Sequence, residues 1–262
     1  TNTAFEHVGI ENALQKALKN DEFFLVYQPQ YRLKDRSYIG MEVLLRWNHP
    51  DLGLVPPSRF ISIAEQSGQI RMIGEWVLSK ACQQGRDWLD QGYNFHRMAI
   101  NISGLQLQQR DFLESFQKHL RASGLPAHYI ELEITETFLM KSTQHAIDAL
   151  KVIKEQGCHV SIDDFGTGYS SMAYLKKLPV TNLKVDQSFV QELPEDQDDA
   201  AITRAIIALA HALNLKVIAE GIETEAQLQF LVDIDCNYGQ GYLFNKPLTV
   251  DQMTSLLSTE RA

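Results

Sequence analysis

Two adjacent aspartates, Asp163 and Asp164, end a short apolar run and are followed by a Gly-Thr-Gly turn. Val160 and Ile162 predict a buried strand immediately before them. In parallel α/β proteins the ligand binds outside the carboxyl ends of the strands, so acids at this junction mark a place where chemistry would occur. The alternative interpretation is an Asx turn that only closes a loop.

Polar side chains also stand at the ends of the other expected strands. They are Glu42, Asn101, Glu133, Lys184, Glu220 and Gln240. Some have a purely structural explanation: Glu42 and Arg46 share one face of a strand and could form an ion pair, Asn101 could cap a helix, and Lys184 could snorkel from an edge. In a barrel, however, all the carboxyl ends of the strands converge on one pocket. Their regular placement therefore favours a functional site.

Five carboxylates that meet in one pocket would repel one another and raise their own pKa values unless cations intervened. The polar strand ends carry neither cysteine nor histidine. Ligand oxygens alone select hard ions such as Mg²⁺ or Mn²⁺ over zinc. This number of acids favours two ions roughly 3.5–4 Å apart, an arrangement used for in-line displacement at phosphorus. The residues thus indicate metal-dependent phosphoester chemistry.

The elements that would position these residues alternate between strand and helix from about residue 96 to the end. This alternation predicts a parallel sheet with crossover helices. The two opening strands, near residues 23–29 and 38–47, are joined by a short link that predicts a hairpin. The expected fold is α/β, a (β/α)8 TIM-like barrel of eight strands with one antiparallel strand near the start. Helices are expected at 111–122, 144–155, 196–214 and 249–258.

Length and composition agree with one large domain. The chain has 262 residues, of which 44% are hydrophobic, enough for a single barrel. Residues 10–19 predict an amphipathic helix, so we expect residues 1–20 to be a lead-in helix that continues from an upstream module and 21–262 to form the barrel. The first residue, Thr1, is not methionine, which suggests a piece of a longer protein.

Charge and cysteine usage limit the partners and the compartment. A formal net charge of -9 argues against binding to nucleic-acid polymers, which requires a basic surface. Cys82, Cys158 and Cys236 are far apart and form no CxxC pair, a pattern typical of reduced core thiols in the cytosol. No segment reads as a membrane span or a signal peptide. We expect a cytoplasmic domain, which leaves open a membrane anchor elsewhere in the parent protein.

The sequence resembles the EAL-domain family, bacterial phosphodiesterases of cyclic di-GMP, from Gln28 to Pro247. The motifs that carry the resemblance are Glu42-Val43-Leu44, Asn101-Ile-Ser, Glu133-Ile-Thr-Glu136, Asp163-Asp-Phe-Gly-Thr-Gly-Tyr-Ser-Ser171, Lys184-Val-Asp186, Glu220-Gly-Ile-Glu223 and Gln240-Gly-Tyr242. Val43 replaces the central alanine of the naming motif. It lies on the strand face away from Glu42, so we expect it to alter packing more than chemistry.

The resemblance implies a role for each matching position. Glu42, Asn101, Glu133, Asp163 and Glu220 would hold one metal ion, and Asp163 and Asp164 would bridge to or bind the second. Lys184 would activate or position the attacking water, and Gln240 would help to orient that water or the shell of the second ion. Lys184, Glu42 and Gln240 are therefore the expected catalytic residues. No catalytic position of the family is missing.

Further roles follow from the resemblance alone. Gln28 and Arg46 would contact the phosphate and guanine of the substrate. Glu223 would tether the loop of residues 165–171, whose position couples dimer contacts to metal binding; the loop residues concerned are Phe165, Gly166, Thr167 and Gly168. The family also implies a homodimer formed through helices between residues 171 and 214.

The resemblance implies hydrolysis of cyclic di-GMP to linear pGpG with Mg²⁺ or Mn²⁺, in a signalling protein that carries an upstream sensory or GGDEF-type domain. Two alternatives remain open. One is a binding module that holds the dinucleotide without cutting it. The other takes Lys184 as a proton-abstracting base beside a metal, as in enolase-type barrels; the paired aspartates and the lack of an arginine cluster for a carboxylate substrate disfavour it.

Overall fold

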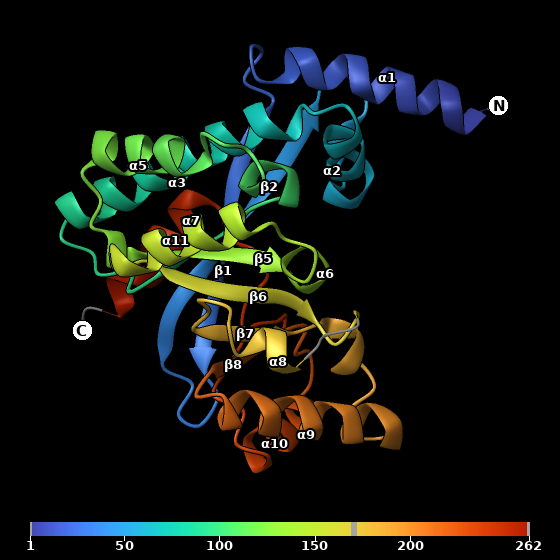
Figure 1. Ribbon diagram of the computed structural model, residues 1–262, viewed down its shortest axis with the longest axis vertical. Helices are drawn as coiled ribbons and strands as arrows, with labels where there is room; N and C mark the ends of the chain where they lie inside the picture. The colour runs from blue at the N-terminus through green and yellow to red at the C-terminus, as the bar shows by residue number, and fades with distance from the viewer. Residues whose placement is uncertain (1, 169–171, 261–262) are drawn as a thin grey trace.

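The computed structural model describes residues 2–168 and 172–260, and its helices surround a central ring of strands (Figure 1). The strands are β1 (Phe23–Arg32), β2 (Tyr38–His49), β3 (Gly53–Val55), β4 (Met98–Asn101), β5 (Ile130–Thr135), β6 (His159–Phe165), β7 (Asn182–Val185), β8 (Lys216–Ala219) and β9 (Tyr238–Gly239). The helices are α1 (Asn2–Ala17), α2 (Pro57–Gln66), α3 (Ile70–Asp90), α4 (Gly104–Leu107), α5 (Phe112–Ser123), α6 (Glu136–Leu139), α7 (Gln144–Glu155), α8 (Met172–Leu175), α9 (Gln197–Ala212), α10 (Glu225–Asp233) and α11 (Val250–Thr259), with the 3₁₀ turns η1 (Ala127–Tyr129) and η2 (Gln187–Phe189).

The strands close into a barrel. Their order in the sheet is β1-β9-β8-β7-β6-β5-β4-β2-β3, and β1 also pairs with β2, so eight strands form a ring and β3 extends from β2 outside it. β1 is antiparallel to both of its neighbours, whereas the other strands of the ring pair in parallel. The predicted barrel with one antiparallel strand near the start is confirmed. β3 is an addition to the eight strands that the sequence predicts.

The two faces of the barrel strands differ in polarity. On β6, Val160 and Ile162 are fully buried in the apolar core, while Ser161 and Asp163 on the opposite face contact polar residues of the neighbouring strands. Fully burying an aliphatic side chain of this kind contributes about 1.5–3 kcal/mol. The apolar core therefore lies between the strands and the helices, and the inside of the barrel is free to carry polar side chains.

Local capping explains where the predicted helices begin and end. α7 has the predicted bounds, and the Thr143 side chain accepts a hydrogen bond from the Ala146 N–H at its start. α9 is shorter than the predicted 196–214 because Asp196 caps its first turn from outside the helix and Asn214 adopts a left-handed φ of 57°. The predicted capping box between Thr224 and Gln227 is present at the start of α10.

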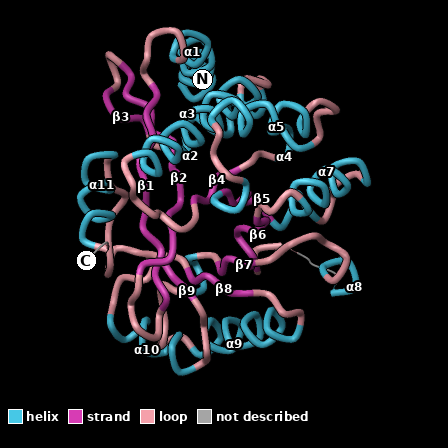
Figure 2. Tube along the Cα trace, turned by 90° about the vertical axis from the view of Figure 1, so that its left-hand side faces the viewer, coloured by secondary structure: helices cyan, strands magenta, loops and turns pink. Residues whose placement is uncertain are grey.

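α1 lies beside the ring rather than in it. Its residues Ile10, Leu14 and Ala17 are buried, and the helix packs near α2, close to the ends of β1 and β2 and far from α9 and α10 (Figure 2). None of the described helices combines the length and the apolarity that crossing a bilayer requires.

Candidate active site

Lys184 stands at the centre of the polar cluster. Its side chain is 0% exposed, and its Nζ lies 2.8 Å from Glu133 Oε2, 2.9 Å from Glu220 Oε1, 3.2 Å from Asp163 Oδ1 and 3.4 Å from Glu42 Oε2. One ammonium group is thus shared by four carboxylates. These acids are far apart in the sequence, and the barrel brings them within reach of a single cation.

The strands place these groups at one end of the ring. Asn101 is the last residue of β4, Glu220 and Gln240 directly follow β8 and β9, and Lys184 lies within β7. The sequence had suggested that Glu42 ends its strand, but β2 continues beyond it to His49. The parallel pairing of β2 with β4 nevertheless stops at Val43, so Glu42 lies where β2 leaves the ring.

Amide side chains form a second layer around the acids. Gln240 donates from Nε2 to Glu42 Oε2 over 2.6 Å, and Asn101 donates to Glu42 Oε1 over 2.7 Å. Gln30 donates to Gln240 Oε1 over 2.8 Å, which fixes the orientation of the Gln240 amide. Gln240 Nε2 also lies 3.4 Å from the side-chain oxygen Oε1 of Gln28, which can accept a hydrogen bond from it. Both oxygens of Glu42 are therefore held by donors, so its carboxylate has a defined orientation.

The electrostatics reflect one cation among several acids. Burial alone would lower the pKa of Lys184, but the charges of Asp163, Glu133, Glu220 and Glu42 raise it well above its usual value. Burial and the charge of Glu42 raise the pKa of Glu133 well above its ordinary range. Burial also raises the pKa of Glu220 to about 8. The site therefore holds more negative charge than Lys184 neutralises.

Glu42 behaves differently from its acidic neighbours. Burial would raise its pKa, but the Lys184 ammonium and the hydrogen bonds from Gln240 and Asn101 together lower it. Four acids cannot all be stabilised as carboxylates by a single ammonium group. The ionised form is therefore favoured at Glu42, whereas the pKa values of Glu133 and Glu220 are shifted in the opposite direction.

The donor set fits a hard divalent ion. One oxygen each from Asp163, Asp164 and Glu220 lie within 4.8 Å of one another. Glu133 Oε1 and Asp163 Oδ1 are buried and accept no hydrogen bond in the described part of the chain, although Lys184 Nζ lies close to the latter. Buried carboxylate oxygens without a hydrogen-bond donor are costly, and a cation would satisfy them. The acidic cluster could therefore hold a metal.

The loop after the paired aspartates is fixed by a residue to which the sequence had assigned no role. The Glu136 carboxylate accepts hydrogen bonds from the N–H groups of Gly166, over 2.9 Å, and Gly168, over 3.2 Å. Gly166 has a φ of 102°, and a Cβ there would lie 2.7 Å from the Phe189 ring, so only glycine fits. Asp164 itself adopts a left-handed φ of 52° at an irregularity in the pairing of β6 with β7.

The remaining positions of this loop have separate contacts. The Thr167 hydroxyl donates to the Asp164 carbonyl oxygen over 2.8 Å, and Phe165 is buried. Residues 169–171, including the expected helix cap at Ser170 and Ser171, lie outside the described residues. Glu223 is exposed, and its backbone N–H donates to Gln227. In the contacts described here, Glu136 is the residue that fixes this loop. A role for Glu223 stays a prediction.

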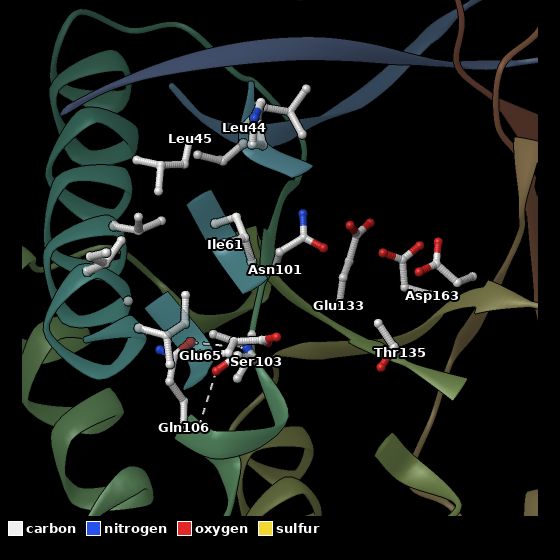
Figure 3. A pocket seen from close by; sticks show the side chains of 18 of the residues that line it. Leu44, Leu45, Ile61, Glu65, Asn101, Ser103, Gln106, Glu133, Thr135 and Asp163 are labelled. Atoms are coloured by element: carbon white, nitrogen blue, oxygen red, sulfur yellow. Dashed lines mark hydrogen bonds between the residues drawn. The ribbon is translucent and has the colours of Figure 1, made fainter. Parts of the chain in front are cut away.

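A cavity of about 310 Å³ opens beside the acids. Figure 3 shows Asn101, Glu133 and Asp163 on one side of it and Leu45 and Ile61 on the other. The wall formed by α2 and α3 is mostly apolar and includes Ile61, Ile70, Ile73 and Val77. Arg46 also lines the cavity; it donates to the Leu45 carbonyl oxygen, and burial lowers its pKa. The site thus joins an acidic cluster to an apolar surface.

Comparison with known proteins gives concordant matches. Residues 11–247 match the family model described as EAL domain. The bifunctional diguanylate cyclase/cyclic di-GMP phosphodiesterase MucR of Pseudomonas aeruginosa is 43% identical over 95% of this chain and 36% of that protein. The cyclic di-GMP phosphodiesterase NbdA of the same organism is 42% identical over 98% of this chain and 33% of that protein. The chain therefore spans about a third of the length of these relatives.

The three-dimensional similarity extends over the whole barrel. A solved structure of the PaMucR phosphodiesterase in complex with c-di-GMP aligns with a TM-score of 0.90 at 43% identity. The alignment covers 94% of this chain and 99% of that one. The closed barrel and its surrounding helices are thus shared with that structure.

Proposed function

The chain belongs to the EAL-domain family, and from this premise we propose that it hydrolyses cyclic di-GMP to linear pGpG with two Mg²⁺ or Mn²⁺ ions. The observation that supports the proposal most directly is the gathering of four carboxylates around Lys184 at the mouth of the barrel. The names of MucR and NbdA agree with this activity.

The proposed ligands of the ions follow from the placement of the acids. Glu42, Asn101, Glu133, Asp163 and Glu220 would hold one ion, and Asp163 with Asp164 would hold the second. Ions held by these residues would lower the pKa of a bound water and so supply a nucleophile near neutral pH, and they would offset the negative charge on the leaving oxygen. The oxygens of Glu133 and Asp163 that accept no hydrogen bond support this assignment.

Lys184 is expected to position groups and stabilise charge rather than to accept a proton. Its pKa lies well above the usual value, so the side chain is an ammonium at neutral pH and has no free lone pair. An ammonium can donate to the attacking water and to a phosphate oxygen. The enolase-type alternative needs a lysine whose pKa is lowered, which is the opposite direction.

Gln240 and Glu42 would act together with Lys184. The Gln240 amide is oriented by Gln30 and donates to Glu42, so its position relative to the acids is fixed. We expect Gln240 to direct the water, or the shell of the second ion, along the line of attack. Removing its amide would take the hydrogen-bond donor from Glu42 Oε2, while Asn101 would still hold Oε1.

The substrate would lie across the cavity, with its phosphate toward the acids. Gln28 and Arg46 are the proposed contacts to phosphate and guanine. The apolar wall of α2 and α3 provides a surface on which a base could pack. Because Arg46 donates only to a backbone carbonyl in its described hydrogen bond, most of its guanidinium donors remain for an anionic ligand.

Regulation would act through the loop of residues 165–168. Phe165, Gly166, Thr167 and Gly168 follow the metal-binding aspartates, so a shift of this loop would move Asp164. We propose that homodimer contacts made between residues 171 and 214, together with Glu223, use this link. The same proposal includes an upstream sensory or GGDEF-type domain and a cytoplasmic location. In it, residues 1–20 lead from that domain into the barrel of residues 21–262.

The direct test is incubation of the chain with cyclic di-GMP and Mn²⁺, followed by identification of the product by mass. We expect linear pGpG, and we expect EDTA or Glu42→Ala to abolish its formation. Glu155→Ala, on the exposed face of α7, is a matched control that should leave turnover unchanged. Undiminished turnover in EDTA or in the Glu42 variant would refute the metal role.

A receptor that binds cyclic di-GMP without cutting it would give a different result. It would bind the dinucleotide at saturating Mn²⁺ and release no pGpG. In that case the acids would serve recognition only, and hydrolysis would have to be withdrawn from the proposal.

A further inference from the structure

A second cavity, of about 290 Å³, lies at the opposite end of the barrel from the acidic cluster. The residues with polar side chains that line it are Arg32, Arg97, His96, His128, His159, Tyr38 and Tyr238. No carboxylate lines it in the described part of the chain. In a protein with a formal net charge of -9, a cavity lined by two guanidinium groups and three imidazoles is unusual.

The barrel topology explains why these residues meet. His159 and Tyr238 begin the parallel strands β6 and β9, and Arg97 directly precedes β4. Arg32 ends β1, and because β1 is antiparallel its last residue lies at the end where the other strands begin. His159 and Asp163 stand four residues apart on β6, roughly 13 Å at about 3.3 Å per residue. The two cavities are therefore separate.

Arg97 is held in place by a buried acid. Its Nη1 lies 2.9 Å from Glu131 Oε2, and Glu131 is 1% exposed. Glu131 also accepts hydrogen bonds from Ser161 and, over 2.7 Å, from Asn182. One edge of the guanidinium is thus fixed to the barrel interior, while its other donors remain on the side that lines the cavity.

The charges that face the cavity from neighbouring elements can be named. Asp35 lies 3.4 Å from Arg32 in an exposed ion pair, which is weak in water. Burial and, to a smaller extent, the charge of Glu260 raise the pKa of Tyr38. The charge of Lys154 contributes to lowering the pKa of His159. Burial, and then the charge of Arg97, lower the pKa of His159, while the buried Glu131 carboxylate opposes them. An anion in the cavity would reverse the second of these effects.

A metal site is the obvious alternative for three histidines. Within the described residues, however, the one group of metal-binding side chains that lie close enough together is Asp163, Asp164 and Glu220, at the other end of the barrel. The geometry therefore does not support transition-metal binding here. Guanidinium forks and imidazolium groups are instead the donors that phosphate oxygens prefer.

We propose that this cavity binds a small phosphate-bearing anion, which is held by the guanidinium groups of Arg32 and Arg97 and by the imidazoles of His96, His128 and His159. The ligand class is a phosphate or diphosphate group, and the site is independent of the one that would hydrolyse the dinucleotide. The three imidazoles can each donate an N–H to an oxygen of the bound anion.

Inorganic pyrophosphate is the probe, added without divalent ions and at constant ionic strength. Histidine ring protons followed by NMR should show saturable shifts for His96, His128 and His159. His49, His119 and His145 lie elsewhere in the fold and serve as internal references. Equal shifts at all histidines, or none, would overturn the proposal.

Two exposed side chains allow a test that does not disturb the buried pair. The double variant Arg32→Gln with His128→Gln should weaken pyrophosphate binding by at least about tenfold, since it removes two charge-assisted hydrogen bonds. The matched control, Arg110→Gln with His145→Gln, changes the same residue types at exposed positions near the starts of α5 and α7. Equal affinity of the two double variants would refute the assignment.

Discussion

Replacing Lys184 by methionine tests whether the shared ammonium group holds the barrel mouth together. Methionine keeps most of the length and apolar character of the lysine stem, so the change mainly removes charge. Four carboxylates would lose a cation that lies 2.8–3.4 Å from their oxygens. Removing one partner of a buried ion pair costs about 3–5 kcal/mol. We expect Lys184→Met to lower the free energy of unfolding by this amount at pH 8 in EDTA.

The loss of unfolding free energy in Lys184→Met should depend on pH in a definite direction. The pKa values of Glu133 and Glu220 are already raised, that of Glu220 to about 8, and they should rise further without the ammonium. A carboxyl group with a raised folded-state pKa stabilises the fold below its unfolded pKa, near 4.3, and loses that contribution as the pH rises through the folded value. Glu220 keeps its proton in both chains below about pH 8, so its part of the stability loss in Lys184→Met grows as the pH rises above about 8. Lys184 lowers the pKa of Glu42, so the part due to Glu42 grows as the pH rises above about 4.3.

Urea-induced unfolding followed by tryptophan fluorescence measures these differences. Mn²⁺ at a hundred times its Kd should return about 2.7 kcal/mol to the variant, because the ion binds the folded state. Lys177→Met, at an exposed position after α8, is the control and should change stability by less than about 0.5 kcal/mol. If Lys184→Met unfolds at the same urea concentration as the parent chain at pH 8 in EDTA, the reasoning fails.

Two further predictions concern the acids and the loop. Glu136→Gln should lower turnover or Mn²⁺ affinity by about 10–100-fold, since the carboxylate that fixes Gly166 and Gly168 is lost. Steady-state kinetics measure this, with Glu155→Gln as the control. Equal values for the two variants would contradict the prediction. Mn²⁺ affinity should fall as the pH drops through about 6, because burial and Asp163 raise the pKa of Asp164 to about 6 and protons then compete with the ion. Calorimetry between pH 5 and 8 checks this, and a flat profile would count against Asp164 as a ligand.

Local signals were sufficient to predict the ring of strands and most helix bounds from the sequence. α7 was predicted to the residue because Thr143 caps it and its apolar residues recur at helical spacing. The barrel followed from the alternation of strand and helix, and its polar mouth from the acids and amides at the strand ends. These features depend on residues close together in the chain, which pattern analysis can detect.

Features that depend on distant contacts were missed. β3 has only three residues and forms because β2 runs past the ring and offers its edge. Glu136 was recognised as part of a motif, but its hold on the Gly166 loop depends on the approach of α6 to the end of β6. The cavity lined by Arg32 and His128 unites segments that carry no shared motif, so nothing in the linear order indicates it.

The polar lining of the barrel interior bears on how such a chain can change over generations. Lys184 and its acids stand on the inner face of the strands, while Leu183 and Val185 on the outer face secure the fold. Replacing one of these inner residues leaves a buried charge without a partner, which lowers the free energy of unfolding. Replacing the whole ionic set by uncharged groups often leaves that free energy unchanged or even raises it. Loss of catalysis in this architecture is therefore expected to be abrupt and concerted. Variants that have lost the whole ionic set are expected to keep a folded barrel, which could then acquire another function.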